Sequence, residues 1–533
     1  MQQGLEEAVF RNIAAVQEMA SITRSSFGPN GLNKLVVNQL NKLFMTADAG
    51  TILKELEIQH PAARVILQAA QQQDAEMGDG TNYVVLLSAS LLERARDLLK
   101  MGLKPAVVSE GFLIGAAKVK EILEELAIAG AEDNLAKIVK TVLMAKQYGV
   151  ENRLSELVLT ACRMVGEDKR IDDQTERQQL VNPDNIRCVK ILGGSLGDSL
   201  VVQGVVLNRL PESARKDWSD GRCKIAVYTC PVDIAQTETK GTVLFNTASE
   251  MLAFSRGEED LIEERIRAIK EAGVRVIVTN EKFGEVALHF INKFDLIAVK
   301  VSSKFDIQRI CKATGAPTLL NFVVPSNDDM CGWCDSLQVR EFGSDRCLLI
   351  RNESARIASI ILRGATLTVM NDYERAIDDA INVIRVLGKQ DERCVAGAGA
   401  CEAELARAML DFAGNTPGLV QYPLRAISEA FEAIPGALAA NAGYDRTDAV
   451  ARLSAAHANG LNKNHGIAID GNVKDPVVDA LANGILDSFA VKQRAIGLAF
   501  EAAQTVLMVD QIIMSKPAGG PTPRAPQSQD PEN

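Results

Sequence analysis

The chain has 533 residues, of which 47% are hydrophobic and 24% are charged, and its formal net charge at pH 7 is -11. A single hydrophobic core stops growing beyond roughly 250–300 residues, so a chain of this length is expected to form about three domains. The net negative charge disfavours nucleic acids and anionic membrane surfaces as partners, because like charges repel at long range.

The first ten residues include Glu6 and Glu7 and lack a basic segment followed by an apolar one, which argues against a secretory signal. The best candidate for a membrane span, residues 497–514, is interrupted by Glu501 and Asp510. We therefore predict a cytoplasmic protein that has neither a membrane nor a nucleic acid as partner.

Amphipathic helix patterns dominate both ends of the chain. Residues 82–99 and 110–126 place apolar side chains at helical spacing, and residues 424–434 and 491–514 continue in this style near the C-terminus. These four segments predict a helical protein whose two ends meet in space to share one core.

The middle of the chain has a different character. Short β-branched runs at 224–230, 274–279 and 296–301 alternate with helical patterns. This alternation predicts a mostly parallel α/β layer inserted into the helical protein. The helical patterns between the runs cover 248–272, 281–293 and 304–313.

The predicted fold is thus a multi-domain combination of α and α/β regions. The boundaries place a discontinuous helical domain at 1–127 and 393–515, a small mixed connection at 128–196 and 356–392, an inserted α/β domain at 197–355, and a disordered tail at 516–533. The tail is assigned from its Pro- and Gly-rich, polar composition.

The segment Gly78–Asn82 directly precedes one of the predicted helices. Glycines let a backbone approach a ligand closely, and a helix N-terminus offers unpaired N–H groups that suit a phosphate. Asp79 inside this segment would repel phosphate unless Mg²⁺ lay between them. An ordinary turn before a helix explains the same residues.

Two further loops have a comparable composition. Residues 26–31 place Gly28 and Gly31 around Pro29 and Asn30, which suits either a phosphate loop or a plain helix-breaking turn. Asp48 lies among small residues before an apolar helix, where it would be either a functional carboxylate or an N-cap.

The segment 373–382 predicts a helix with one apolar face. Asp378 lies at the edge of that face and Asp379 points nearly opposite to it. Asp379 would therefore face another domain across a cleft, or both residues would belong to a solvated acidic surface.

Cysteine use suggests free thiols, since ten cysteines are scattered along a chain without an export signal. Cys331 and Cys334 form a lone CxxC motif. A redox role and a plain loop with two thiols both remain open for this motif, whereas a zinc site would need a second pair of ligands.

The order of the motifs resembles that of group II chaperonins, and the resemblance covers essentially the whole chain except the tail. The matching segments are GPNG at 28–31, TADAGTIL at 46–53, GDGTN at 78–82, DYERAIDDA at 372–380, GAGACEAEL at 397–405 and GILDSFAVK at 484–492. Several other stretches, including 146–149 and 509–517, resemble one particular subunit type of that family.

The resemblance implies the chaperonin fold. The helical domain would be the equatorial, ATP-binding domain, the mixed connection the intermediate hinge domain, and the α/β unit the apical domain that binds substrate. A helical protrusion over about 234–272 would act as the lid. Residues 304–312 would form a helix facing substrate, although a solvated amphipathic face explains them equally well.

The resemblance also implies a site for ATP or ADP with Mg²⁺. Asp79 resembles the Mg²⁺ ligand. Asp379 resembles the residue that orients the attacking water, Asp48 a carboxylate near the γ-phosphate, and Lys146 the γ-phosphate sensor. The remaining nucleotide contacts would come from Gly28, Pro29, Gly80, Thr81, Asn82, Gly397 and the ribose-binding carboxylate Asp487.

By the same resemblance, the chain would be an ATPase subunit in a hetero-oligomeric double ring of paralogous subunits, with eight subunits per ring. ATP hydrolysis would close the chamber around non-native proteins of the actin and tubulin class. Phosphoryl transfer to water needs positioning and charge neutralisation more than covalent chemistry, which agrees with these residues.

Some positions depart from the family pattern, and two alternatives to an active ATPase subunit stay open. Asn30, Ala47, Asn82 and Ala398 replace residues usual in the family, and an alanine at 398 would be strained if the loop needs a positive φ. One alternative is a structural ring subunit that binds nucleotide with slow or no hydrolysis. The other is a small-molecule kinase using GDGTN and Asp379.

Overall fold

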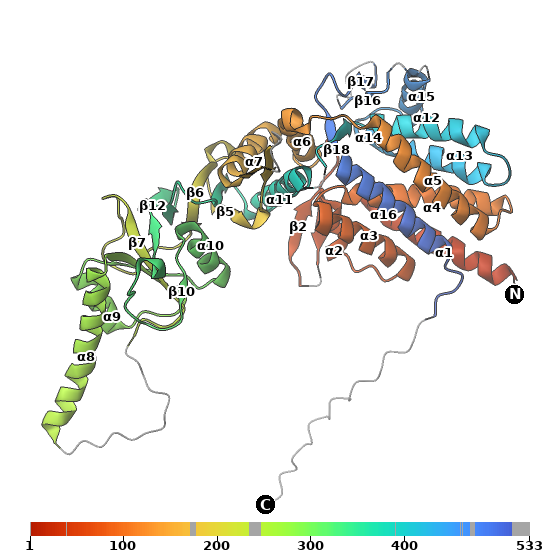
Figure 1. The fold of residues 1–533 in the computed structure, drawn as a ribbon. Coiled ribbons are helices and arrows are strands. Elements are labelled where there is room, and N and C mark those ends of the chain that lie inside the picture. Colours follow the sequence, from red (N-terminus) through yellow and green to blue (C-terminus); the bar gives the residue numbers. More distant parts are fainter. Residues whose placement is uncertain are drawn as a thin grey trace, which may run out of the picture.

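The computed structural model describes residues 2–38, 40–170, 177–233, 247–389, 391–458, 460, 462–469 and 475–513. The tail predicted as disordered, 516–533, lies outside these residues. A helical region, a small mixed region and an α/β region follow one another along the molecule (Figure 1). None of the described helices combines the length and apolarity needed to cross a bilayer.

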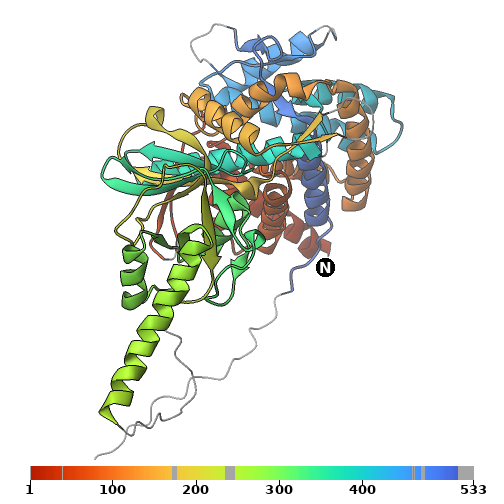
Figure 2. The same ribbon diagram turned by 60° about the vertical axis from the view of Figure 1, so that its left-hand side comes forward.

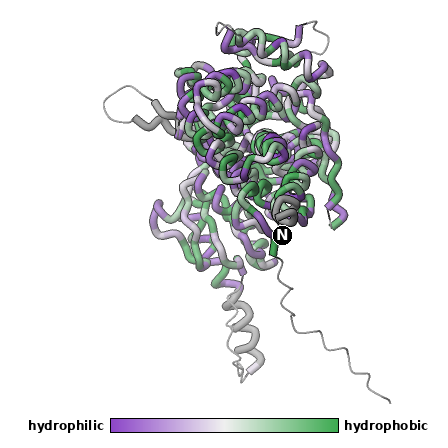
Figure 3. The backbone as a smooth tube through the Cα atoms, turned by 90° about the vertical axis from the view of Figure 1, so that its right-hand side faces the viewer, coloured by the Kyte–Doolittle hydropathy of each residue, from purple (hydrophilic) through white to green (hydrophobic). Residues whose placement is uncertain are grey.

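The helical region is built from both ends of the sequence. One core cluster contains side chains from Val9 to Leu123 and from Val395 to Leu507. Hydrophilic and hydrophobic residues alternate along its helices, as amphipathic helices around a common core require (Figure 3). Its helices are α1 (Gln2–Arg24), α2 (Ala49–Glu55), α3 (Pro61–Met77), α4 (Thr81–Lys100), α5 (Pro105–Leu126), α12 (Ala400–Asn415), α13 (Gln421–Phe431), α14 (Ala433–Asn441), α15 (Arg446–His457) and α16 (Phe489–Leu507).

Two of the predicted helices differ from the helices observed. The helix predicted over 424–434 is divided between α13 and α14, because Pro435 lacks an N–H and its ring clashes with the carbonyl four residues earlier. The helix predicted over 491–514 ends at Leu507, and the described residues beyond it leave the helical conformation.

Short antiparallel strand pairs complete the helical region. The first pair, β1 (Lys34–Val37) with β2 (Leu43–Thr46), precedes α2. The others are β15 (Cys394–Ala396) with β18 (Leu486–Ser488), and β16 (His465–Ile467) with β17 (Val477–Asp479). The pair β15–β18 brings residues almost a hundred positions apart to one edge of the helical core.

The mixed region surrounds α11 (Leu367–Lys389). Its core cluster joins α11 to α6 (Ala131–Met144), α7 (Glu151–Val165) and the strands β5 (Ile186–Leu192) and β14 (Ala358–Gly364). The hairpin β3 (Glu167–Arg170) with β4 (Arg177–Leu180) and the short turn η1 (Pro183–Asn185) precede β5.

A five-stranded sheet connects the mixed region to the α/β region. Its order is β12-β13-β6-β14-β5, and only the β14–β5 pair is parallel. The sheet runs across the boundaries predicted at residues 196 and 356. Its further elements are η2 (Leu196–Asp198), β6 (Leu200–Leu207), β12 (Ser336–Phe342) and β13 (Asp345–Arg351).

The α/β region contains a second sheet of order β10-β7-β8-β9, in which all three neighbouring pairs are parallel. The predicted α/β alternation is therefore correct. Apolar side chains of α8 and α9 cover one face, and those of α10 cover the other. The elements are β7 (Cys223–Tyr228), α8 (Ala248–Glu271), β8 (Val274–Thr279), α9 (Glu285–Lys293), β9 (Ile297–Lys300), α10 (Lys304–Thr314), β10 (Thr318–Leu319), η3 (Asp328–Met330) and the antiparallel β11 (Gly332–Cys334).

The helix α8 points away from the helical region at the far end of the α/β region (Figures 1 and 2). It covers most of the segment 234–272 that was predicted as a protrusion. Residues 234–246 of that segment lie outside the described part of the chain.

Candidate functional site

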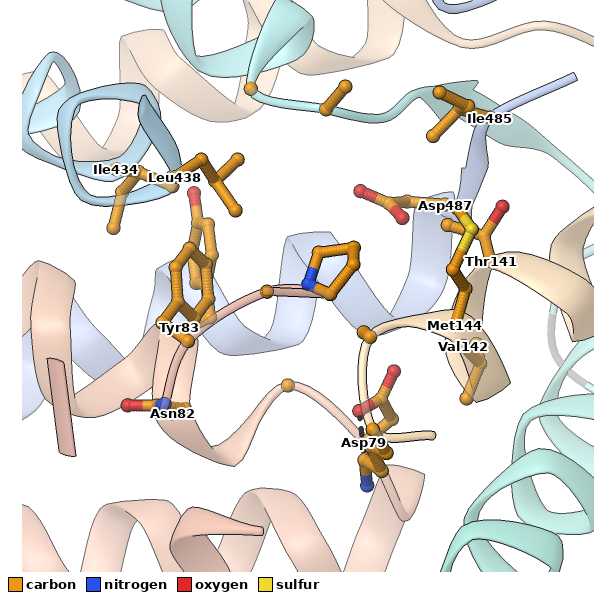
Figure 4. Close-up of a pocket in the computed structure, with 18 of the residues that line it drawn as sticks. Asp79, Asn82, Tyr83, Thr141, Val142, Met144, Ile434, Leu438, Ile485 and Asp487 are labelled. Carbon is orange, nitrogen blue, oxygen red and sulfur yellow. Dashed lines mark ion pairs between the residues drawn. The ribbon is translucent and has the colours of Figure 1, made fainter. Parts of the chain in front are cut away.

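A pocket opens between the helical region, at the start of α4, and the mixed region, from which residues 141–142, 144–146 and Val383 also line it. Figure 4 shows Asp79 and Asn82 on one side, Asp487 and Ile485 on the other, and Tyr83 and Leu438 at the end between them. Its lining includes most of the predicted nucleotide contacts, namely Gly28, Pro29, Asp48, Asp79, Gly80, Thr81, Asn82, Lys146 and Asp487. Asp379 and Gly397 are not among the lining residues. Asp379 contacts the lining residue Lys146, and Gly397 lies next to the lining residue Asp487.

The GDGTN segment forms the predicted turn and helix start. α3 ends at Gly78 and α4 begins after Gly80, and both glycines have a positive φ, 77° and 84°. A Cβ on Gly78 would lie 2.3 Å from the Cβ of Asn382 in α11, so only glycine fits there. No side chain of the described residues caps α4. The first amides of α4 are therefore available to an anion, which they would bind together with the positive end of the helix dipole.

Four charged side chains from separate parts of the sequence meet beside this turn. The Nζ atom of Lys146 lies 3.5 Å from Oδ1 of Asp79 and 3.8 Å from Oδ1 of Asp48, and it forms an ion pair with Asp379. Lys146 and Asp379 are each 13% exposed. The prediction that these distant residues share one site thus agrees with their positions.

Asp48 caps a helix, one of the two roles considered for it, and it also faces the charged cluster. Its Oδ2 atom accepts hydrogen bonds from the backbone N–H and the hydroxyl of Thr51, at 2.9 and 2.8 Å, which makes it the N-cap of α2. Its Oδ1 atom faces Lys146. Capping therefore fixes the orientation in which the carboxylate meets the charged cluster.

Burial and mutual charge shift the pKa values of this cluster in different directions. Burial raises the pKa of Asp379 well above its ordinary value, even though Lys146 acts against it. Burial also raises the pKa of Asp48, but Lys146 and Thr51 outweigh it and leave this pKa below its ordinary value. Burial lowers the pKa of Lys146, but the three carboxylates more than offset it, so the ammonium stays charged.

Sequence reasoning missed a fourth carboxylate, Asp74, one turn before the end of α3. Burial and the charge of Asp48 raise the pKa of Asp74, which places it electrostatically within the cluster. Its spacing of five residues before Asp79 was the available signal, but such spacing is common on any helix.

The opposite side of the pocket contains a second charged cluster. Lys492 Nζ lies 2.7 Å from Oδ2 of Asp487 and 2.7 Å from Oε1 of Glu402. Glu402 is fully buried, and its Oε2 atom has no hydrogen-bond partner among the residues that the structure describes. Burial lowers the pKa of Lys492, but Asp487 and Glu402 outweigh it. Asp487 was predicted, whereas Glu402 and Lys492 were missed although both lie within the motif segments.

Two loops close the pocket between these clusters. Asn30 donates from Nδ2 to the carbonyl of Ile469 at 2.7 Å, which ties the GPNG loop to the segment after β16. Gly397 donates from its N–H to the carbonyl of Ile485, and a Cβ at Gly397 would lie 3.3 Å from Oδ1 of Asp487. Gly397 is thus next to the pocket without lining it.

Two of the departures from the family pattern have visible consequences. Ala398 has a φ of 56°, so the strain expected for alanine at this position is present. Asn82 donates from Nδ2 to the carbonyl of Thr23 in α1, and in the described part of the chain its buried Oδ1 atom has no hydrogen-bond partner. The amide of Asn82 is therefore engaged with the protein.

The carboxylates at the pocket suit a hard cation such as Mg²⁺ only together with oxygen atoms of a bound phosphate compound. Among the described residues, no group of three or more His, Cys, Asp or Glu side chains is arranged to hold a metal. Mg²⁺ is usually held by one or two carboxylates together with phosphate oxygens and water. Asp79, which faces the pocket beside the phosphate-type helix start, fits that mode of binding.

Comparison with known proteins assigns the class. Residues 19–517 match the TCP-1/cpn60 chaperonin family, and the chain therefore belongs to this family.

The relatives carry the name of one subunit type. T-complex protein 1 subunit theta of Homo sapiens is 45% identical over 527 residues, covering 98% of this chain and 93% of the relative. The theta subunit of Dictyostelium discoideum is 44% identical, with 98% and 95% covered. The probable theta subunit of Schizosaccharomyces pombe is 43% identical over 534 residues, with 98% and 95% covered. The predicted resemblance to the theta subunit is confirmed.

Proposed function

We propose that this chain is an ATP-hydrolysing subunit of a cytoplasmic chaperonin, a hetero-oligomeric double ring with eight paralogous subunits in each ring. The observation that carries the proposal is the meeting of Asp48, Asp79 and Asp379 around Lys146 at the edge of one pocket. A chaperonin subunit without this cluster of charges could still assemble with its partner subunits, but it would have no site for ATP hydrolysis.

The side of the pocket at Asp79 would hold the phosphates. The free amides at the start of α4 and the Lys146 ammonium offer positive charge there, and the glycines on both sides of Asp79 allow close approach of the backbone. Mg²⁺ bound to Asp79 would offset the charge that the carboxylates and the phosphates share.

The side at Asp487 would hold the sugar. The carboxylate of Asp487 is partly exposed and lies next to Gly397, which has no side chain to obstruct a ligand. Apolar side chains such as Leu438 and Ile434 lie further along the pocket (Figure 4). A carboxylate accepts hydrogen bonds from hydroxyl groups, and apolar walls suit a flat base.

Asp379 would orient and deprotonate the attacking water. Burial raises the pKa of Asp379, so its carboxylate is a stronger base than that of an exposed aspartate, which suits a group that accepts a proton from water. Asp379 comes from α11 in the mixed region, whereas Asp79 comes from the helical region. Movement between the two regions would therefore assemble or disperse the site, so that hydrolysis accompanies closure of the chamber.

The test is single-turnover hydrolysis of ATP with Mg²⁺ by the full-length chain, alone and assembled with its partner subunits. Asp379→Asn is expected to retain ATP binding and to lower the rate by about 100-fold or more. Asp378→Asn is the matched control, since Asp378 is the exposed neighbour on the same helix and is expected to leave the rate unchanged. Equal rates for all three proteins would contradict the proposed role of Asp379.

The second candidate is a ring subunit that binds nucleotide with slow or no hydrolysis. The strained Ala398 and the engagement of Asn82 with Thr23 favour it, because both alter the loop and the helix start at the pocket. Wild-type protein that binds ATP but shows no single turnover would support this candidate over the first.

The α/β region would bind non-native proteins of the actin and tubulin class, and α8 would contribute to the lid. The N-terminal half of α10 exposes Phe305 beside Lys304, which suits mixed apolar and polar contacts with an unfolded chain. Crosslinking of folding intermediates to α10 in the assembled particle would test this part of the proposal.

A further inference from the structure

The α/β region contains a buried pair of thiols that the proposed function does not use. Cys223 begins β7 and Cys334 ends β11, and their Sγ atoms lie 3.1 Å apart. Each side chain is 1% exposed. A disulfide bond needs an S–S distance of about 2.05 Å, so a shift of about 1 Å would bring the two sulfur atoms to bonding distance.

The strand register places the two cysteines directly opposite each other. β11 pairs with β7 in antiparallel orientation, with Cys334 facing Cys223. Cα atoms of directly opposed residues in antiparallel strands are about 4.5–5.5 Å apart, which lies within the range that a disulfide spans. The backbone therefore already satisfies the main geometric condition for a cross-link.

The CxxC motif does not supply the partner of Cys334. Cys334 belongs with Cys223 to the core cluster on the α10 side of the sheet, whereas Cys331 belongs to the cluster on the α8 and α9 side. The two cysteines of the motif thus face opposite sides of the sheet. The CxxC motif therefore marks the segment that contains Cys334, but the cysteine in contact with Cys334 is Cys223 and not Cys331.

We propose that Cys223 and Cys334 are a modification site at which a peroxide forms an intrachain disulfide. In the first step, the Cys223 thiol takes one oxygen from hydrogen peroxide and becomes a sulfenic acid, and water leaves. In the second step, the Cys334 sulfur attacks the Cys223 sulfur, the S–O bond breaks, and a second water leaves with the Cys334 proton. The two thiols together lose two electrons and two hydrogens, and the peroxide accepts both.

The order of these steps follows from the contact between the thiols. The hydrogen bond from Cys334 lowers the pKa of Cys223, and the same contact, together with burial, raises the pKa of Cys334. Since the thiolate is the form that reacts with peroxide, Cys223 reacts first. Access comes from local opening of β11, a strand of three residues that pairs, within the described ranges, with β7 alone.

The cross-link would fix one end of an exposed segment. β10 and β11 both pair with β7, and the chain between them leaves the sheet and exposes Leu320 and Val323, at 76% and 44%. A disulfide at Cys334 would tie the far end of this segment to β7 covalently. Oxidation would therefore restrict the apolar segment without touching the candidate nucleotide pocket.

The test is peptide mapping by mass spectrometry of the full-length protein after treatment with hydrogen peroxide, under non-reducing conditions. A linked peptide pair containing Cys223 and Cys334, two hydrogen atoms lighter than the separate peptides, is expected, and dithiothreitol should separate it. Met101, which is 72% exposed, reports through its sulfoxide that the oxidant has acted. Complete oxidation of Met101 with both cysteines still open to alkylation would overturn the proposal, as would a link between Cys331 and Cys334.

Matched variants extend the test. Cys331→Ser is expected to retain the cross-link, and Cys223→Ser is expected to abolish it and to leave Cys334 open to alkylation. Limited chymotrypsin cleavage between Leu320 and Met330 is expected to slow after oxidation of the wild type and to recover on reduction. Cleavage that is equally fast in the linked and reduced proteins would refute the restriction of the segment.

Discussion

The two opposite sides of the pocket each place one lysine among carboxylates, but the two charged clusters are assembled in different ways. Lys146 meets Asp48 and Asp79 from the helical region and Asp379 from α11 of the mixed region. Lys492 meets Asp487 and Glu402, which come from β18 and α12 in the C-terminal part of the helical region. The first cluster joins two cores and would change if their arrangement changed, whereas the second lies within one part of the fold.

This comparison separates the expected roles of the two lysines. Lys146, whose cluster joins two regions, is expected to act in the hydrolysis step, which would depend on how the regions are arranged. Lys492, whose cluster lies within one region, is expected to act in nucleotide binding and in stability. Substitutions of the two lysines by methionine, which keeps most of the length of the unbranched side chain and removes the charge, test this separation most directly.

The largest effect is expected from Lys146→Met. Removing one preorganised donor from an oxyanion hole costs about 100- to 1,000-fold in rate, and we expect a loss of the same order when the positioned charge of Lys146 is removed. Single-turnover hydrolysis of ATP by the full-length chain measures this loss, and Lys120→Met on the exposed surface of α5 is the control. A rate within about threefold of the wild type would place Lys146 outside the chemistry.

The next largest effect is expected from Lys492→Met, and it concerns stability. Glu402 would remain fully buried without its cation, which costs about 3 kcal/mol or more when a buried ion pair is broken. Hydrogen exchange of amides in α12 and α16 would measure the loss locally. The double variant Lys492→Met with Glu402→Gln should recover much of it, and failure to recover would show that the pair is not the cause.

A pH-dependent effect is expected from Glu404, two residues beyond Glu402 in α12. Burial raises the pKa of Glu404, but hydrogen bonds from His457 and Arg407 outweigh it and lower this pKa from 4.5 to about 2. Because the pKa of the folded state is depressed, the stabilisation is complete above pH 4.5 and is lost as the pH falls toward 2.

Between pH 7 and pH 3 the loss should be about 2 kcal/mol. The measurement is the difference in unfolding free energy between the wild type and Glu404→Gln at several pH values. The difference should be largest near neutral pH and shrink below pH 4.5. A difference that does not change with pH would mean that packing, and not charge, holds Glu404.

The smallest effect is expected from Ala398→Gly at the edge of the pocket. A non-glycine residue with a positive φ costs roughly 1 kcal/mol, so glycine should stabilise the loop by about that amount or slightly less. Ala408→Gly in the middle of α12 is the control and should destabilise the protein, since glycine weakens a helix interior. Thermal unfolding of the two variants measures both signs, and stabilisation by both would contradict the assignment of strain.

The sequence by itself determined the local features of this protein. Amphipathic spacing located about half of the helices, β-branched runs located β7, β8 and β9, and the GDGTN segment marked the start of α4. These features depend on residues within a few positions of one another, which sequence patterns represent well. The order of several such motifs was also enough to identify the family.

Only the tertiary structure decided which distant residues touch. Glu402 and Lys492 are separated by 90 positions and lie on helices whose patterns look ordinary, so no local signal joins them. Cys334 pairs with Cys223 across a strand register, although its nearest cysteine in sequence is Cys331. Such contacts are fixed by helix packing and strand pairing, which depend on the whole core and are not encoded at any single position.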